Sequence, residues 1–550
     1  MSQAGTGLTA GPPVGFVGAK QEGRAGGWPR LSRAGNGVGV IAVLVAWELL
    51  ALFVFAGKHV MPTPFGLAGG LWDNRALLWA NAGTTLSEAG QGWLWGNALA
   101  IGAALLFVVS PPVEAALLRL AIASYCMPII AIAPILNIVF NGEQPKVVLA
   151  AVSVFFTTLI GVTAGLRSAD QLTLDVVHAY GGTKWTALSK IRLRAALPSL
   201  FAALCIAVPA ALLGAIIGEY LGGNDGIGVA MINAEQSLEV TRVWSLALFA
   251  AALAGAGYAV TAAVARLATP WARGAAAGPG PARPPARSSS TMAGRVARSA
   301  GFLALSVAAA LVCWVGFIKV FNLNSYFAKT PADVWDYLFQ GSSAAADRQQ
   351  LWAALLTTLR DASLGYAAGT LLAVVAAMAV VSNRTVEAAF MPVAVVLRSV
   401  PLVAMTPLIA LAFGRGLLSV TVIAGIVTFF PTLVYVVSGL RSPPLESVLL
   451  MRAYDASNRA TLFKLRLPSA LPSLFSSAKI AAPGAMLGAV LAEWLSTGQG
   501  LGYLMLEAST TSAFAQLWSG VVLITVVSAV IYAFVGLVEG PVLRRFGPAG

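Results

Sequence analysis

Residues 147–168 read VVLAAVSVFFTTLIGVTAGLRS, and residues 421–442 read TVIAGIVTFFPTLVYVVSGLRS. Both stretches end on Gly-Leu-Arg-Ser, and they lie 274 residues apart. Each is close to the ~20 apolar residues that cross a ~30 Å hydrocarbon core as a helix. The two stretches therefore predict one kind of membrane-spanning helix that occurs twice in the chain.

The composition of the whole chain is that of a membrane protein. Of its 550 residues, 58% are hydrophobic and only 10% are charged, whereas soluble domains have about 25% charged residues. In lipid the backbone must satisfy its own hydrogen bonds, and the sequence lacks the polar–apolar alternation of a membrane barrel. We therefore expect an all-α polytopic protein that is surrounded by a lipid bilayer.

The repeat extends over the whole chain, with an offset that drifts only from 267 to 274 residues. Such a conserved order indicates duplication and fusion. We expect two homologous halves of six spans each, about 12 in all, related by a pseudo-two-fold axis along the membrane normal. Matched positions include Trp47 and Trp314, Pro64 and Pro331, Thr85 and Thr358, Pro198 and Pro472, and Glu219 and Glu493.

The apolar runs divide the chain into four regions. We predict a disordered cytoplasmic tail at 1–36, a first transmembrane domain at 37–266, a linker rich in Pro, Gly, Ser and Arg at 267–298, and a second transmembrane domain at 299–545. The predicted spans of the first domain are 37–57, 91–109, 113–140, 147–166, 199–221 and 243–266. Those of the second are 299–321, 354–382, 386–413, 416–439, 473–496 and 517–541.

The net charge of +13 reflects topology and not nucleic-acid binding. Arg and Lys gather between alternate spans, as they do in cytoplasmic loops, so both termini are predicted to be cytoplasmic. Cys126, Cys205 and Cys313 stand alone in apolar runs, and the chain has two histidines. This pattern predicts neither a disulfide nor a metal site.

A polar segment with helical periodicity follows the fourth span of each half. Each segment is predicted to form a short helix, a turn, a second short amphipathic helix, and a proline that restarts the chain at the membrane. Exposed apolar positions on such helices suit docking into a groove of a soluble partner. The candidate residues are Asp175, Gly181, Gly182, Trp185, Ile191, Leu193 and Pro198 in the first half, and Tyr454, Asp455, Leu465, Leu467, Pro468 and Pro472 in the second.

These segments resemble the cytoplasmic coupling motif of ATP-binding-cassette (ABC) importer permeases. In that motif an acidic residue, two small residues, three variable residues and a glycine precede an aliphatic–x–Leu–Pro sequence. Asp175 and Gly181 match the acid and the glycine in the first half, and Leu467-Pro468 match the Leu-Pro in the second. Both halves also resemble permeases of nitrate, sulfonate, taurine and thiamine-precursor importers through Trp47-Glu48, Pro62-Thr63-Pro64, Arg398-Ser399-Val400-Pro401, and Glu493 with Gly500-Leu501-Gly502-Tyr503.

The resemblance implies a permease of the bacterial inner membrane. Two ATPase subunits, which bind ATP and Mg, would dock on the coupling segments, and an extracytoplasmic binding protein would deliver a small solute. The chain itself has no Gly-x-x-x-x-Gly-Lys-Ser/Thr loop, so we expect no enzyme activity and no cofactor in it. An ion-gradient-driven carrier of 12 spans is the alternative. The residues do not identify the solute, for which the resemblance implies a small anion or a vitamin precursor.

Each coupling segment departs from the motif in a different place. The second has Leu449 in place of the acid and Asp455 in place of the glycine, whereas the first has Arg194 in place of the proline. A residue other than glycine costs about 1 kcal/mol where the backbone is left-handed. We therefore expect both segments to dock ATPases, but unequally, so that changes at Tyr180-Gly181 uncouple transport more than changes at Tyr454-Asp455.

Several further residues are candidates for a gate or a solute pathway. Glu219 and Glu493 end the fifth spans before glycine-rich loops, and either line the pathway or are tied to those loops. Arg398 could attract anions, although its counterpart in the first half is Tyr125. The prolines of the third spans either line the pathway or only bend a helix. These prolines are Pro128, Pro134, Pro401 and Pro407.

Overall fold

The computed structural model of the chain describes residues 41, 44–45, 47–54, 61–140, 142–272, 292–383, 385–387, 390 and 402–546. In these residues all regular structure is helical. The predicted tail and most of the predicted linker lie outside the described residues, and so do Arg398 and Pro401.

Eight helices of the described residues are long and apolar enough to cross a membrane, and a bent pair of helices makes a ninth if it is counted as one span. An apolar stretch, Ala304–Val320, lies within α12 (Met292–Val320). The predicted spans 37–57 and 386–413 fall in segments that are described only in part. The eight are α3 (Arg75–Val109), α6 (Gln144–Arg167), α9 (Leu193–Gly222), α11 (Val240–Ala268), α14 (Ala344–Ser382), α17 (Leu417–Leu440), α20 (Leu467–Ala492) and α22 (Phe514–Phe546).

Both halves repeat the same close packing of helices. In the first half α6 packs between α3 and α9, and in the second α17 packs between α14 and α20. Small residues allow this approach: a Cβ added at Gly92 would lie 2.8 Å from the carbonyl oxygen of Val147, and one at Gly365 would lie 3.1 Å from that of Thr421. Because lipid gives no hydrophobic drive between helices, such small-residue contacts are a main source of their association.

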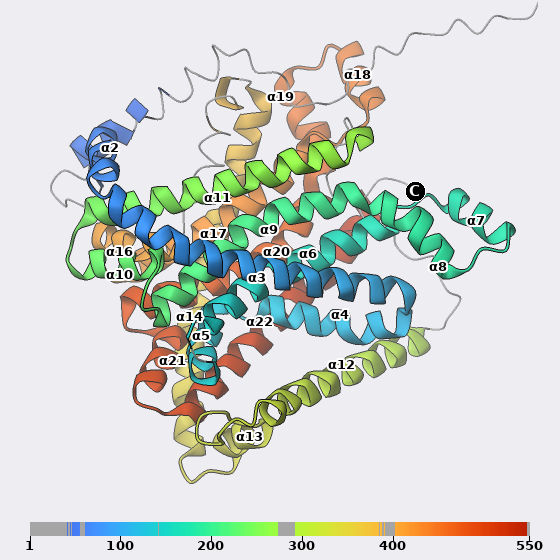
Figure 1. Cartoon of the computed structure of the whole chain (residues 1–550). Helices are drawn as coiled ribbons and strands as arrows, with labels where there is room; N and C mark the ends of the chain where they lie inside the picture. The colour runs from blue at the N-terminus through green and yellow to red at the C-terminus, as the bar shows by residue number, and fades with distance from the viewer. Residues whose placement is uncertain are drawn as a thin grey trace, which may run out of the picture.

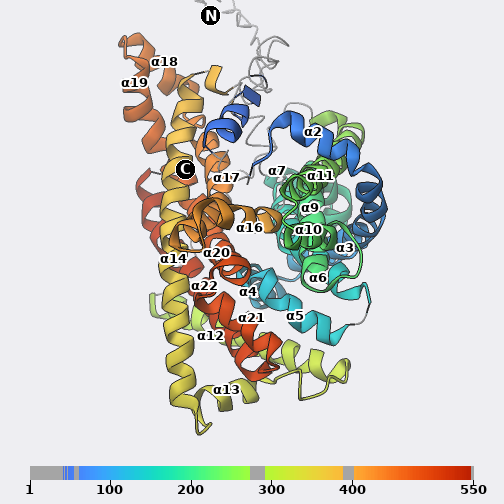
Figure 2. The ribbon, with the colours of Figure 1, turned by 90° about the vertical axis from the view of Figure 1, so that its left-hand side faces the viewer.

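The helices of the two halves cross each other. Helices α9 and α11 run across Figure 1 and are seen nearly end-on in Figure 2, whereas α14 runs from top to bottom in both views. Helix α4 (Pro111–Cys126) lies between the halves, where it contacts α12 and α22. The hydroxyl of Tyr125 on α4 donates a hydrogen bond across this interface to the carbonyl oxygen of Ile480 on α20, at 3.1 Å.

Several predicted boundaries differ from the structure. Helices α3 and α14 begin at Arg75 and Ala344, well before the predicted starts at 91 and 354, because polar residues there are bonded within the protein. The third span of the first half is broken, since the chain turns by 93° between 120–126 and 129–137. The expectation that Pro198 and Pro472 restart the chain is wrong: Lys184–Gly222 and Asn458–Thr497 are each continuous, as neighbouring helices can support a proline inside a membrane helix.

Candidate functional site

The predicted coupling segments form two similar helical loops. The first consists of α7 (Gln171–Ala179), α8 (Lys184–Ala187) and a wide π-helical turn (Leu188–Arg192) that leads into α9. The second consists of α18 (Leu445–Ala453), α19 (Asn458–Thr461) and the equivalent wide turn (Leu462–Arg466) before α20. Thr183 and Ser457 cap α8 and α19 in the same way. The sequence therefore builds the same loop twice.

The turn between the short helices is left-handed in both loops. Gly181 has φ +75° and Asp455, its equivalent, has φ +51°. The backbone N–H of each donates to the residue three positions earlier, Gly181 to His178 at 3.0 Å and Asp455 to Arg452 at 2.9 Å. Since a left-handed backbone favours glycine, Asp455 stands at the position where the replacement of glycine is unfavourable.

Both loops expose apolar side chains at their tips. Tyr180 is 90% exposed and Tyr454 is 81% exposed, and Leu172 and Leu445 are also exposed near the start of α7 and α18. Trp185 is exposed on α8, where the second loop has Arg459. Clustered exposed apolar groups mark interaction surfaces. Figure 1 shows α7 and α8 projecting at the right and α18 and α19 at the top, away from α10 and α21.

The other predicted residues of the two loops lie between the exposed tips and the membrane-spanning helices. Asp175 is exposed and accepts a hydrogen bond from Gln171. A Cβ added at Gly182 would lie 2.7 Å from the carbonyl oxygen of Val177, so this position also requires a small residue. Ile191 and Leu465 lie in the wide turns, Leu193, Leu467 and Pro468 begin α9 and α20, and Pro198 and Pro472 lie inside these helices.

An ion pair connects the end of the fourth span to the start of the third in each half. Arg167 of the first Gly-Leu-Arg-Ser sequence pairs with Glu114. Arg441 of the second pairs with Glu387, with 2.8 Å between Nη2 and Oε1. The repeated tetrapeptide thus has a structural role next to each coupling loop.

Glu219 and Glu493 are buried and hold the start of a short helix. Glu219 Oε2 accepts from the backbone N–H of Gly228 at 2.6 Å, in the first turn of α10 (Ile227–Gln236). Glu493 Oε2 accepts from Gly502 at 2.8 Å, in the first turn of α21 (Gly500–Thr510). Both glutamates are 1% exposed. Because the first N–H groups of a helix lack partners within it, a buried carboxylate satisfies one of them here.

A threonine completes each of these caps. Thr85 Oγ1 accepts from the N–H of Ile227, and Thr358 Oγ1 accepts from that of Leu501, both at 2.9 Å. The caps leave no room for a side chain at Gly226, the residue before α10, or at Gly500, the first residue of α21: a Cβ at either would overlap the glutamate carboxylate, and both glycines have positive φ. In this conformation the two glutamates are tied to the glycine-rich loops.

The charges around the two caps differ. In the first half Lys146 Nζ lies 3.0 Å from Glu88 Oε1 and 2.8 Å from Glu143 Oε2, and the side chains of Lys146 and Glu88 are each 2% exposed. The second half has Val420 at the position of Lys146. The buried cation is therefore specific to the first half.

Comparison with known proteins identifies the family. The profile described as "Binding-protein-dependent transport system inner membrane component" matches residues 96–274 and again residues 369–545. The chain belongs to this family. A "Probable ABC transporter permease protein" of Haemophilus influenzae is 32% identical over 212 residues, which are 38% of this chain and 86% of that relative.

Two further relatives carry the name of a solute. The riboflavin transport system permease protein RibX of Chloroflexus aurantiacus is 29% identical over 229 residues, 41% of this chain and 84% of its own. The putative aliphatic sulfonates transport permease protein SsuC of Bacillus subtilis is 27% identical over 195 residues, 36% of this chain and 71% of its own. This chain is thus a transmembrane ABC permease that is built twice, and a permease component is not itself an enzyme.

The prolines of the permease's third spans lie at or near the interface of the halves. Pro128 is buried at the break between α4 and α5 (Ile129–Val139), and Pro134 is buried inside α5. Pro407 is buried inside α16 (Leu402–Phe413). The break at Pro128 creates two helix ends inside the span, which is more than the predicted bend.

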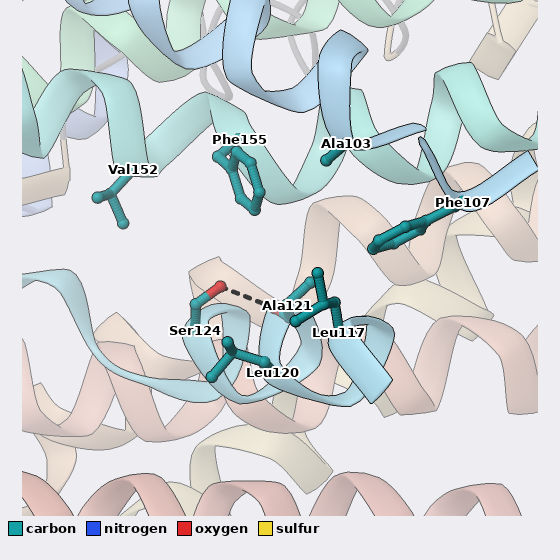
Figure 3. A pocket seen from close by; sticks show the side chains of 8 residues that line it. All are labelled: Ala103, Phe107, Leu117, Leu120, Ala121, Ser124, Val152 and Phe155. Carbon is teal, nitrogen blue, oxygen red and sulfur yellow. Dashed lines mark hydrogen bonds between the residues drawn. The ribbon is translucent and has the colours of Figure 1, made fainter. Parts of the chain in front are cut away.

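An apolar hollow of about 250 Å³ lies between α3, α4 and α6 of the permease (Figure 3). Phe107, Leu117 and Phe155 line it, and its one hydroxyl, on Ser124, already donates to the carbonyl oxygen of Ala121 at 2.8 Å. Such a lining offers no polar group to a polar solute. The hollow is therefore not a candidate for recognition of a charged solute.

The sequence prediction missed the polar side chains that surround the starts of α10 and α21. Lys146 lies one residue before a predicted span and Glu88 three residues before another, so both were outside the apolar windows. A usable signal was present, because Thr85 and Thr358 belong to the repeated Thr-Thr-Leu sequence. A polar residue that recurs next to an apolar span is a candidate for a buried hydrogen bond.

Proposed function

We propose that this single chain forms the complete translocation pathway of an ABC importer. The two regions 37–266 and 299–545 would act as the two transmembrane domains that surround a solute. The family profile, which occurs twice in the chain, supports this assignment. The crossed arrangement of the halves, with α4 between them, is consistent with a pathway at their interface.

Two ATPase subunits, which bind ATP and Mg, would dock on the two coupling loops. The observation that carries this proposal is the pair of loops with the same left-handed turn and an exposed tyrosine at each tip, Tyr180 and Tyr454. Because these tips are where an ATPase would bind, this side of the permease and both termini would be cytoplasmic. The chain would need no cofactor of its own.

An extracytoplasmic binding protein would deliver the solute to the opposite side of the permease, near α10 and α21. Relatives are named for riboflavin, aliphatic sulfonates and nitrate. We propose a solute of comparable size, a small anion or a vitamin precursor, whose identity is set mainly by the binding protein.

Co-purification tests the docking of the ATPase. The tagged permease is expressed with the ATPase encoded beside it, extracted in mild detergent, and assayed for bound ATPase subunits and ATP hydrolysis. We expect two ATPase copies per permease, and loss of both when residues 175–198 and 449–472 are scrambled together. The control replaces Trp335 and Phe339 by Ser, because these aromatics are also exposed, on α13 (Pro331–Phe339), but lie far from the loops.

A different result would assign the permease to another class of transporter. A permease that retains no ATPase, and whose solute uptake collapses with a protonophore while ATP is held constant, would be a gradient-driven carrier. That result would overturn the proposal of an ATP-driven importer.

A further inference from the structure

The second half contains an ion pair within its spans that the first half lacks. Lys479 Nζ on α20 lies 3.3 Å from Glu539 Oε2 on α22. At the equivalent positions the first half has Cys205 and Ala265. A charge within a span costs about 2.5–3.5 kcal/mol on insertion scales, and such residues commonly mark solute pathways. The pair therefore calls for a role beyond packing.

The accessible member of this pair is the cation. Both carboxylate oxygens of Glu539 have partners, since Ser476 Oγ donates to Oε1 at 3.0 Å, and the side chain is only 14% exposed. The Lys479 side chain is 31% exposed. An ammonium group has three donors, and among the described residues Glu539 is the one acceptor bonded to it.

Space next to the ammonium group is kept open by a glycine. A Cβ added at Gly536 on α22 would lie 3.4 Å from Lys479 Nζ. The first half has Ala262 at the equivalent position. Tyr532, one helical turn earlier on α22, places its ring centre 5.1 Å from Nζ, which is within the range of a cation–π contact.

The cluster lies at the interface of the two halves. Ile480, the neighbour of Lys479, accepts the hydrogen bond from Tyr125 of α4. The residue next to Lys479 thus contacts α4 of the first half, and α4 also packs against α22, which carries Glu539 and Tyr532.

We propose that Lys479 is a solute-binding residue of the pathway and that it recognises the anionic oxygens of a small solute, such as a carboxylate, sulfonate or phosphate group. This inference rests on the proposed function, because it needs the pathway to run between the halves. Glu539 and the ring of Tyr532 hold the ammonium group in place, and the free donors of Lys479 face the solute.

The competing explanation is that Lys479 and Glu539 only join α20 to α22. A joining role requires neither water nor anions at the pair, so the accessibility of a nearby thiol to charged reagents separates the two explanations. Cys126, Cys205 and Cys313 are replaced by Ala, and S476C is introduced beside the pair. The rates of modification by an anionic sulfonatoethyl and a cationic trimethylammonioethyl methanethiosulfonate are then measured in membranes, at rest and with ATP.

We expect the ratio of anionic to cationic modification at S476C, its charge preference, to fall roughly tenfold in K479M, because the thiol lies against the Glu539 carboxylate and Lys479 no longer offsets that charge. K479R should leave the preference unchanged, and E539Q should shift it toward the anionic reagent because the cation loses its counter-charge. The control is A202C, the equivalent position in the first half, where K479M should change nothing.

Two results would overturn the proposal. One is an S476C thiol that neither reagent modifies, at rest or with ATP, and the other is a charge preference that K479M leaves unchanged. Retention of the ATPase by the same preparations keeps this test separate from that of the proposed function. If the ATPase is retained and the preference is absent, the permease is an ABC importer whose Lys479 only joins two helices.

Discussion

The caps of α10 and α21 share two hydrogen bonds but differ in the others and in their electrostatic surroundings. In the first cap the N–H of Gly226 also donates to Asn81 Oδ1 at 3.1 Å, whereas in the second Thr358 Oγ1 donates to Glu493 Oε2 at 2.9 Å. Both helices begin on a threonine hydroxyl and a glutamate carboxylate from two neighbouring spans. Only the first half adds a buried lysine, Lys146, and places it against Glu88. In the second half Asp361 replaces Glu88 and pairs with Arg360, whose side chain is mostly exposed. The shared backbone bonds fix the start of each short helix, and the buried lysine is an addition in the first half.

This difference makes the two halves unequal in their dependence on charge. Removing one partner of a buried ion pair leaves an uncompensated charge, whereas a well-packed apolar residue at the same place creates no such demand. We therefore expect the first half to depend on Lys146, whereas the second half buries an apolar residue, Val420, at that position.

The largest expected effect is that of Lys146→Met. It leaves Glu88 buried without its cation, so we expect a loss of about 3–5 kcal/mol in the free energy of unfolding. The measurement is thermal or denaturant unfolding in detergent. The matched change in the second half, Val420→Met, should cost less than about 1.5 kcal/mol. Adding Glu88→Gln to Lys146→Met should recover part of the lost free energy of unfolding. Equal losses from Lys146→Met and Val420→Met would contradict the unequal dependence of the two halves on charge.

A smaller effect is expected from glycine replacement, and it should be alike in both halves. Gly226→Ala and Gly500→Ala each place a methyl group onto the capping glutamate at a residue with positive φ. We expect each to cost about 1–3 kcal/mol, seen as faster proteolysis near α10 or α21. Gly255→Ala, which meets open space on α11, is the control. A large effect in only one half would show that the caps are not equivalent.

The coupling turns should respond in opposite directions. Asp455→Gly removes an unfavourable left-handed residue and should stabilise the second loop by up to about 1 kcal/mol, whereas Gly181→Asp should destabilise the first by a similar amount. The number of ATPase subunits retained per permease measures the effect of each substitution. Replacing Tyr180 and Gly181 together should reduce transport-linked ATP hydrolysis more than replacing Tyr454 and Asp455. Equal losses would show that the two loops contribute equally.

The smallest effect is expected for the ion pairs beside the loops. Arg167 and Arg441 are about half exposed, and exposed pairs contribute at most about 1 kcal/mol. Arg167→Gln and Arg441→Gln should therefore shift the melting temperature only slightly, and high salt should weaken the wild-type pairs to the same level. A loss of several kcal/mol from either would mean that the pair is desolvated in the membrane-inserted protein.

The sequence alone predicts the repeated architecture and much of the coupling loops. The offset between halves, the apolar runs and the turn at Gly181 can all be read directly from the sequence. The left-handed turn has Asp455 at the position where the resemblance suggests glycine. The predicted unequal contribution of the loops stays a prediction.

What the sequence could not reveal depends on contacts between distant segments. Lys146 meets Glu88 only because α3 packs closely on α6, and Lys479 meets Glu539 only because α20 packs on α22. Because hydropathy is averaged over a window of residues, charged residues such as these appear only as the end of a span or as an interruption within it. The break before Pro128 was also beyond prediction, since a proline can bend a helix or interrupt it, and packing around it decides which.

A single lysine at the interface has a consequence for how many charges a solute meets. In a symmetric dimer every residue occurs twice, so two ammonium groups would approach each other across the axis and repel. A chain that carries both halves can hold an odd number of charges there. Cys205 is the counterpart of Lys479 in the first half. Because both halves belong to one fused chain, this transporter can present different charges on the two sides of its interface.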